Sequence, residues 1–190
     1  MRIAVSGTHC MGKSTFIEDF IKIHSEYKSE LEPYYELEDE KFTELEPSFD
    51  SLLAQLDYSI AQLNQHSDQP NIIFDRCPVD FVAYAMCEAE QEGIHIHDTE
   101  IAERFNDIKQ ALNHLDLIIF LPITDSYSIL YTEENPAYRK AADKNFKKLY
   151  RDDICDIFPQ YGHPKIVEIW GERETRIKML ELLCQGFGTL

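Results

Sequence analysis

The sequence predicts an α/β fold in which helices cover a parallel β-sheet. Short apolar runs alternate along the chain with segments whose apolar residues recur at helical spacing, an order that is typical of such folds. The run Leu117–Leu121 is apolar throughout and ends at Pro122, as expected for a strand buried on both faces. Hydrophobic residues make up 44% of the chain, which is enough to build a core. A length of 190 residues without internal repeats predicts one domain over residues 1–190.

Apolar runs bounded by polar or turn-forming residues predict the strands. The expected strands, in chain order, are Arg2–Ser6, Asn71–Asp75, Leu117–Leu121 and Ile166–Trp170. A weaker pattern at Tyr34–Leu37 indicates a further short strand. It lies within Ser29–Asp50, a segment with nine acidic residues and only Lys41 as a basic one. We interpret this acidic segment either as a solvated loop or as a wall over the substrate site that disfavours highly anionic substrates.

Apolar residues at helical spacing predict the helices between these strands. The expected helices begin near Lys13 and, further along, cover Phe49–Gln65, Asp80–Glu92, Asp98 or Thr99 to Leu112, Arg139–Ile157 and Glu172–Cys184. Ser48 and Asp80 are expected to cap the starts of two of them, and Gly93 the end of one. Residues 124–138 show no clear period. We expect them to cross the top of the sheet, within a lid of approximately residues 124–160.

The charge of the chain excludes two classes of partner. Acidic side chains outnumber basic ones by 35 to 18, for a formal net charge of -17 at pH 7. Proteins that bind nucleic acid or an anionic membrane normally present a basic face, so we expect neither partner. No apolar stretch reaches the roughly 18 residues of a membrane-spanning helix. The five cysteines contain no C-x-x-C pair, which is typical of a reducing cytoplasm. The sequence leaves the oligomeric state open.

A phosphate-binding motif follows the first predicted strand. Residues 7–14 match G-x-x-x-x-G-K-[ST] at every defined position. Its glycines let backbone N–H groups turn toward a polyphosphate, and the helix that follows adds its positive dipole end. We expect Lys13 to reach the β- and γ-phosphates of ATP, Ser14 to bind Mg2+, and Thr15 to bond the α-phosphate. The expected nucleotide-binding residues are Gly7, Thr8, His9, Cys10, Met11, Gly12, Lys13, Ser14 and Thr15.

The loop alone does not fix the reaction, because GTPases, motor ATPases, transporters and kinases share it. The chain contains no N-K-x-D motif, and no D-x-x-G switch follows the loop, which argues against a signalling GTPase. It is also too short for a transporter ATPase and lacks that class's second Gly/Ser-rich signature. The features that identify the reaction class must therefore come from outside the loop.

Two charged residues stand where the predicted strand Asn71–Asp75 ends. Beside a phosphate loop, a carboxylate such as Asp75 can hold Mg2+ or accept a proton from an attacking hydroxyl. Arg76 offers a planar fork of donors to a phosphate or to the transition state. We therefore predict Asp75 as metal anchor or catalytic base, and Arg76 as a catalytic residue.

The segments GTHCMGKST at 7–15 and DRCPVD at 75–80 resemble those of the P-loop nucleoside and nucleotide kinases. A late lid arginine and a glycine-arginine turn after the last strand add to the likeness. The pattern is similar to a small AAA-domain branch of ATP-binding proteins, related to nicotinamide-riboside kinase and deoxynucleoside kinase domains. The resemblance covers nearly the whole chain, although DRCPVD replaces the E-R-S of deoxynucleoside kinases and so disfavours a deoxynucleoside acceptor.

This resemblance implies a P-loop NTPase fold whose five strands have the order 2-3-1-4-5. It implies that Asp75 acts as base or metal anchor, that Arg76 contacts phosphate, and that Gln55 or Gln62 touches the substrate. Arg139 corresponds to the lid arginine, in a segment up to Arg151 that holds six of the 18 basic residues; the same cluster could instead be a solvated basic face. Arg173 corresponds to the residue that packs against the adenine ring.

Together these features predict an Mg-ATP-dependent kinase that transfers the γ-phosphoryl of ATP to a nucleoside, a nucleotide or a related metabolite. The alternative is a non-catalytic ATP- or GTP-binding regulatory protein. A polynucleotide end kinase would need a basic groove for its strand, which the net charge of -17 disfavours.

Overall fold

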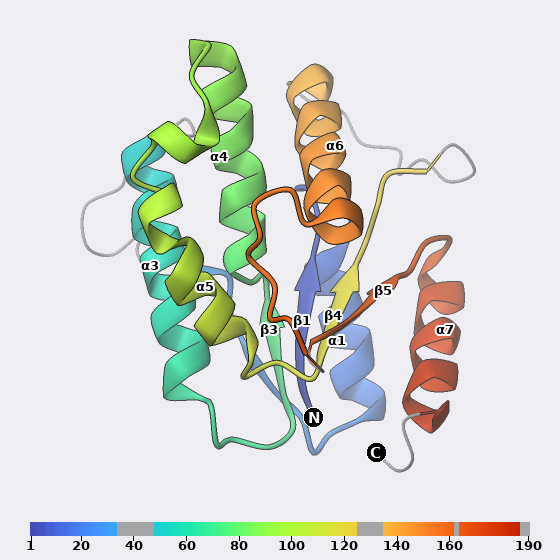
Figure 1. Ribbon diagram of the computed structural model, residues 1–190. Helices are drawn as coiled ribbons and strands as arrows, with labels where there is room; N and C mark the ends of the chain where they lie inside the picture. The colour runs from blue at the N-terminus through green and yellow to red at the C-terminus, as the bar shows by residue number, and fades with distance from the viewer. Residues whose placement is uncertain (34–47, 125–134, 162–163, 187–190) are drawn as a thin grey trace.

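Five parallel strands form one sheet in the order β2-β3-β1-β4-β5. The computed structural model describes residues 1–33, 48–124, 135–161 and 164–186 (Figure 1). The strands are β1 (Arg2–Ser6), β2 (Lys28–Glu30), β3 (Ile72–Asp75), β4 (Leu117–Phe120) and β5 (Lys165–Glu168). The predicted α/β fold and its strand order are therefore confirmed.

Helices cover both faces of the sheet. The described α-helices are α1 (Lys13–Ile23), α3 (Phe49–Gln65), α4 (Pro78–Glu92), α5 (Phe105–Leu112), α6 (Pro136–Asp152) and α7 (Arg173–Gly186). Phe20 of α1 and Leu180 of α7 share a core with Ile3 of β1, whereas helices α3 to α6 pack on the face that carries Ala4. This alternation along β1 is the two-residue period of a strand.

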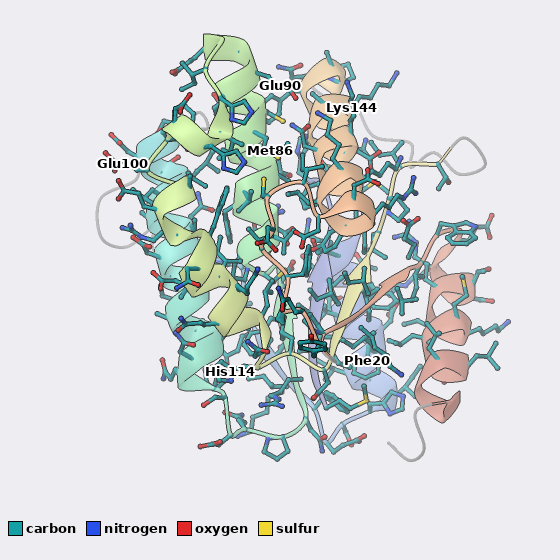
Figure 2. The ribbon with its side chains drawn as sticks, viewed as in Figure 1. Phe20, Met86, Glu90, Glu100, His114 and Lys144 are labelled. Atoms are coloured by element: carbon teal, nitrogen blue, oxygen red, sulfur yellow. The ribbon has the colours of Figure 1, made fainter. Side chains whose placement is uncertain are left out.

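The helices α4 and α6 stand side by side and extend beyond the arrowheads of β1 and β4 in the view of Figure 1. Side chains fill the space between these two helices, where Met86 and Glu90 are labelled in Figure 2. There Lys148 of α6 forms an ion pair with Glu90 at 3.0 Å. Both helices lie near the carboxyl ends of the strands (Figure 1).

Two predicted elements differ from the structure. The second strand of the sheet is Lys28–Glu30, which pairs with β3 from Lys28 opposite Ile72; as a short polar edge strand it leaves no apolar signal. The predicted strand Tyr34–Leu37 lies outside the described residues. The helix expected from Asp98 or Thr99 to Leu112 is not continuous. A 3-10 turn, Ile96–Asp98, ends where it was expected to begin, and a second one, Ala102–Arg104, precedes α5.

The start of α4 corrects the predicted cap. The helix begins at Pro78, a residue suited to the first helical turn, and Cys77 occupies the N-cap position. Asp80 is therefore the third helical residue, and its Oδ2 accepts a hydrogen bond from the Cys77 N–H at 3.1 Å. The boundaries of β5, α6 and α7 differ from the predicted ones by a few residues, as is usual for element ends.

Within the described parts of the chain, no helix is both long and apolar enough to cross a membrane.

Candidate functional site

The phosphate loop joins the end of β1 to the start of α1, and its two glycines stand where the backbone requires them. Gly7 has a φ of +138°, and a Cβ there would lie 2.7 Å from the carbonyl oxygen of Leu121. Gly12 has a φ of +78° and is the N-cap of α1. Side chains rarely adopt such backbone angles, so both positions favour glycine for conformational reasons.

Lys13 is folded back over the loop. Its side chain is buried, and Nζ donates to the carbonyl oxygen of Thr8 at 3.2 Å. Burial, reinforced by the positive charge of Arg76, lowers the pKa of Lys13 to about 8, although nearby carboxylates oppose this change. The ammonium group therefore lies in a place where a bound anion would stabilise its charged form.

Ser14 and Asp75 meet at the end of the sheet. Val5 of β1 pairs with Asp75 of β3, and this register brings Asp75 beside the loop. The Ser14 hydroxyl donates to Oδ2 of Asp75 at 2.8 Å. The other oxygen, Oδ1, is buried and accepts no hydrogen bond from any described residue.

This pair fits Mg2+. The ion prefers oxygen ligands and is commonly held by one or two protein groups together with substrate phosphates and water. The hydroxyl of Ser14 and the unbonded Oδ1 of Asp75 are such oxygens. The described residues contain no group of three or more His, Cys, Asp or Glu side chains that could hold a metal ion.

Arg76 is a buried cation at the same edge. It has a φ of +82°, and its Nη1 donates to the Gly7 carbonyl and to Oδ1 of Asp80, each at 3.3 Å. Asp80 is fully buried and also accepts the Gly7 N–H at 3.2 Å. Burial raises the pKa of Asp80, while the charges of Arg76 and Lys13 oppose that rise. Arg76 and Asp80 together tie the first residue of the loop to α4.

Glu32 is a site residue that sequence reasoning missed. Arg76 donates through Nε to Oε1 of Glu32, whose side chain is 20% exposed. Burial alone would raise the pKa of Glu32, but the positive charges of Arg76 and Lys13 outweigh it and lower that pKa. Glu32 belongs to the acidic segment Ser29–Asp50, and nothing in the sequence distinguishes it from the other eight acidic residues there.

Tyr84 of α4 is a second missed residue. Its hydroxyl accepts the His9 N–H at 2.8 Å, and its ring lies 5.4 Å from the guanidinium carbon of Arg76. The ring also stacks on Tyr138 of α6, with centroids 6.1 Å apart. Tyr84 thus contacts the phosphate loop, the buried arginine and α6. Its position within an apolar helix gave no sign of this.

Arg139 lies against the loop from α6. Its Nη2 donates to the carbonyl oxygen of Cys10 at 3.3 Å and contacts the sulfur of Met11 at 2.9 Å. The predicted lid arginine and the phosphate loop are therefore neighbours. Of the predicted lid, residues 125–134 lie outside the described part of the chain.

Arg173 does not reach the loop. It forms an ion pair with Asp19 on α1, and its side chain is 60% exposed. Arg176, three residues further along α7, is buried instead and donates through Nη1 to the carbonyl oxygen of Met11 at 2.5 Å. The predicted packing of Arg173 against an adenine ring stays a prediction. No signal in the sequence indicated that Arg176 would be buried.

The remaining predicted residues lie near the loop or on α3. Thr15 follows Ser14 on α1 and is exposed. On α3, the side-chain amide of Gln55 donates to the carbonyl oxygen of Ser51 at 3.2 Å, and Gln62 is buried. The arrangement does not separate these two glutamines as candidates for a substrate contact.

Known proteins share the sequence pattern and the fold of this chain. Residues 2–176 match the sequence model of a family described as AAA domain. A comparison with curated proteins finds no match.

Solved structures of two kinases and of the NadR protein share the fold. Deoxyadenosine kinase from M. mycoides with bound dATP is similar with a TM-score of 0.62 and 20% identity, over 97% of this chain and 100% of that chain. Thymidylate kinase from Candida albicans gives a TM-score of 0.61 and 18% identity, over 97% of this chain and 91% of that one. The NadR protein in complex with NR gives a TM-score of 0.64 and 14% identity, over 100% of this chain and 51% of that chain.

Proposed function

We propose that this chain, which belongs to the AAA domain family and shares its fold with nucleoside and nucleotide kinases, is an Mg-ATP-dependent phosphotransferase. Its acceptor would be a nucleoside, a nucleotide or a related small metabolite. The observation that carries the proposal is the contact of Ser14 with Asp75 at 2.8 Å, because it joins the phosphate loop to a carboxylate at the sheet edge where Arg76 is also buried.

The loop residues and Asp75 form the donor side of the proposed site. The N–H groups of the loop and Lys13 would hold the β- and γ-phosphates. Ser14 and Asp75 would hold Mg2+, which offsets the negative charge of the transferring phosphoryl group. Asp75 already accepts a hydrogen bond from Ser14, which favours the role of metal anchor over that of base.

Glu32 and Arg76 form the acceptor side. The lowered pKa of Glu32 leaves it ionised near neutral pH and makes it a weak base. Its role as acceptor of the proton of an attacking hydroxyl therefore rests on its place beside Arg76 and not on its pKa. Arg76 orients that carboxylate through their hydrogen bond. Arg139 would contribute positive charge to the transferred phosphoryl from α6, which we propose to be part of a lid.

The charge balance on the acceptor side favours a hydroxyl over a phosphate as the acceptor group. The guanidinium of Arg76 is already paired with two carboxylates, those of Glu32 and Asp80. An anionic acceptor that approached Arg76 would also approach the carboxylates of Glu32 and Asp80, and their negative charges would repel it. A neutral hydroxyl meets no such cost.

A coupled assay of ADP release from Mg-ATP tests the proposal against a panel of nucleosides, nucleotides and related metabolites. We expect one class of compound to stimulate ADP release, and Lys13→Ala to abolish that stimulation. Tight nucleotide binding without stimulation by any compound would instead support a non-catalytic ATP- or GTP-binding protein. Binding of ATP that is unaffected by Lys13→Ala would contradict the role assigned to the loop.

A further inference from the structure

Arg176 connects α7 to the phosphate loop through a buried contact. Its side chain is 5% exposed. Nη1 donates to the carbonyl oxygen of Met11 at 2.5 Å, and Nε donates to the carbonyl oxygen of Gly171 at 2.8 Å. One guanidinium therefore bridges the phosphate loop and the turn that follows β5.

The first of these bonds fixes the orientation of a peptide group in the loop. The carbonyl of Met11 and the N–H of Gly12 belong to one planar trans peptide, in which the two groups point in opposite directions. While Arg176 holds the carbonyl, the Gly12 N–H points away from Arg176. A peptide flip at this position would break the contact with a buried cation.

The second bond fixes the guanidinium itself. Because Nε is held by Gly171 in the turn after β5, the planar fork cannot rotate without losing that bond. The ideal Cβ position at Gly12 lies 3.6 Å from Nη1, so the fork packs closely against the loop backbone. A lysine carries the same charge but lacks the planar pair of donors.

Arg139 makes a similar contact with the preceding peptide group, since its Nη2 donates to the carbonyl oxygen of Cys10 at 3.3 Å. Two consecutive loop carbonyls are thus held by arginines from two different helices, α6 and α7. Lys13 on α1 and Asp80 on α4 hold other groups of the same loop.

We propose that Arg176 is a positioning residue for phosphate binding. It holds the Met11–Gly12 peptide so that the Gly12 N–H faces the polyphosphate before the ligand arrives. The proposal rests on the proposed nucleotide-binding function, and it assigns to Arg176 no contact with the substrate. Its consequence is that Arg176 acts on the affinity for the phosphate chain, with or without a nucleoside attached.

The test measures binding of Mg-ATP and of inorganic tripolyphosphate by isothermal titration calorimetry to the full chain. We expect Arg176→Ala to weaken both ligands by about 10- to 100-fold, the range of one charge-assisted hydrogen bond. Arg176→Lys should fold and should still bind less tightly than the wild type, because it cannot make both bonds. Lys178→Ala is the matched control, since Lys178 is an exposed cation of the same helix, and it should bind both ligands like the wild type.

Chemical rescue separates positioning from a general loss of stability. Methylguanidinium added to Arg176→Ala should restore much of the affinity for tripolyphosphate, because it can occupy the vacated space and donate to the Met11 carbonyl. The proposal is overturned if Arg176→Ala and Arg176→Lys both bind tripolyphosphate like the wild type, or if methylguanidinium restores nothing in a folded variant. A wild-type chain that binds neither ligand would instead overturn the proposed function.

Discussion

Replacing Glu32 with Gln should remove most of the phosphoryl transfer and leave ATP binding close to that of the wild type. In the proposed reaction Glu32 accepts the proton of the acceptor hydroxyl, and loss of such a base typically lowers the rate by about 10²- to 10⁴-fold. Glu32 contacts Arg76, whereas the proposed nucleotide-binding residues are those of the phosphate loop. The effect should therefore appear in kcat and not in the dissociation constant for Mg-ATP.

The same substitution should lower stability, because Arg76 loses one of its carboxylate partners. A charge-assisted hydrogen bond contributes about 1.5 to 3 kcal/mol. Arg76 is buried, but it keeps Oδ1 of Asp80 and the Gly7 carbonyl at 3.3 Å each. These remaining partners limit the penalty, so we expect a loss at the lower end of that range, about 1.5 to 2 kcal/mol.

The stability difference should depend on pH in a defined direction. The folded protein lowers the pKa of Glu32, because Arg76 and Lys13 outweigh the effect of burial. A carboxyl of this kind contributes its full stability above its unfolded pKa of about 4.3, and loses it as the pH falls through the lowered folded pKa. The difference between wild type and Glu32→Gln should thus be constant near neutral pH and shrink below about pH 4.

Initial-rate kinetics and urea unfolding measure both effects. Asp57→Asn is a matched control, because Asp57 is 47% exposed and pairs with Arg104 at 2.7 Å on the surface. Loss of an exposed pair should cost about 0 to 1 kcal/mol, and the rate should not change. A wild-type turnover rate in Glu32→Gln would refute the assignment of Glu32 as base.

Three further substitutions or conditions test other parts of the site. Gly7→Ala should lower the free energy of unfolding by about 1 to 3 kcal/mol, because its Cβ would lie 2.7 Å from the Leu121 carbonyl oxygen. Gly93→Ala is the control and should cost less, since a Cβ there meets nothing within 4 Å. Equal losses of stability in calorimetry would contradict this. Since the pKa of Lys13 is about 8, the affinity for tripolyphosphate should fall as the pH rises from about 7 to about 9. Binding should also take up protons, which calorimetry in buffers of different ionisation enthalpy measures. Binding without proton uptake would argue against a contact between Lys13 and the phosphates. Asp75→Asn should lower the apparent affinity for Mg2+ in turnover by about 10- to 100-fold and leave the binding of Mg-free ATP intact. An unchanged Mg2+ titration would exclude Asp75 as the metal anchor.

The parts of the fold that the sequence predicted are those with a strong local signal. The apolar runs of β1, β3 and β4 are buried on both faces, and the glycine pattern of the loop has a conformational cause at Gly7 and Gly12. The edge strand Lys28–Glu30 is polar and partly exposed, so it carried no such signal. Apolar spacing at 98–112 indicated the buried side of the segment but not its 3-10 hydrogen bonding.

The site residues that the sequence did not predict depend on tertiary contacts. Glu32 is one of nine acidic residues in its segment and is distinguished only by its contact with Arg76. Arg173 and Arg176 both stand in the first turn of α7, and Asp19 pairs with the former while the latter is buried against the loop. Asp80 was expected to be an N-cap. Its contact with the Gly7 N–H could not be predicted, because that contact depends on how α4 is placed at the carboxyl ends of the strands.

Transfer of an isotopically labelled γ-phosphoryl group from Mg-ATP tests the central claim most directly. The labelled phosphoryl should appear on the hydroxyl of one nucleoside or related metabolite, at a rate that depends on Mg2+ and is lost in Lys13→Ala. Phosphorus NMR would identify the bond that forms. Label that remains in ATP with every acceptor, in a protein that binds Mg-ATP tightly, would contradict phosphoryl transfer as the function of this chain.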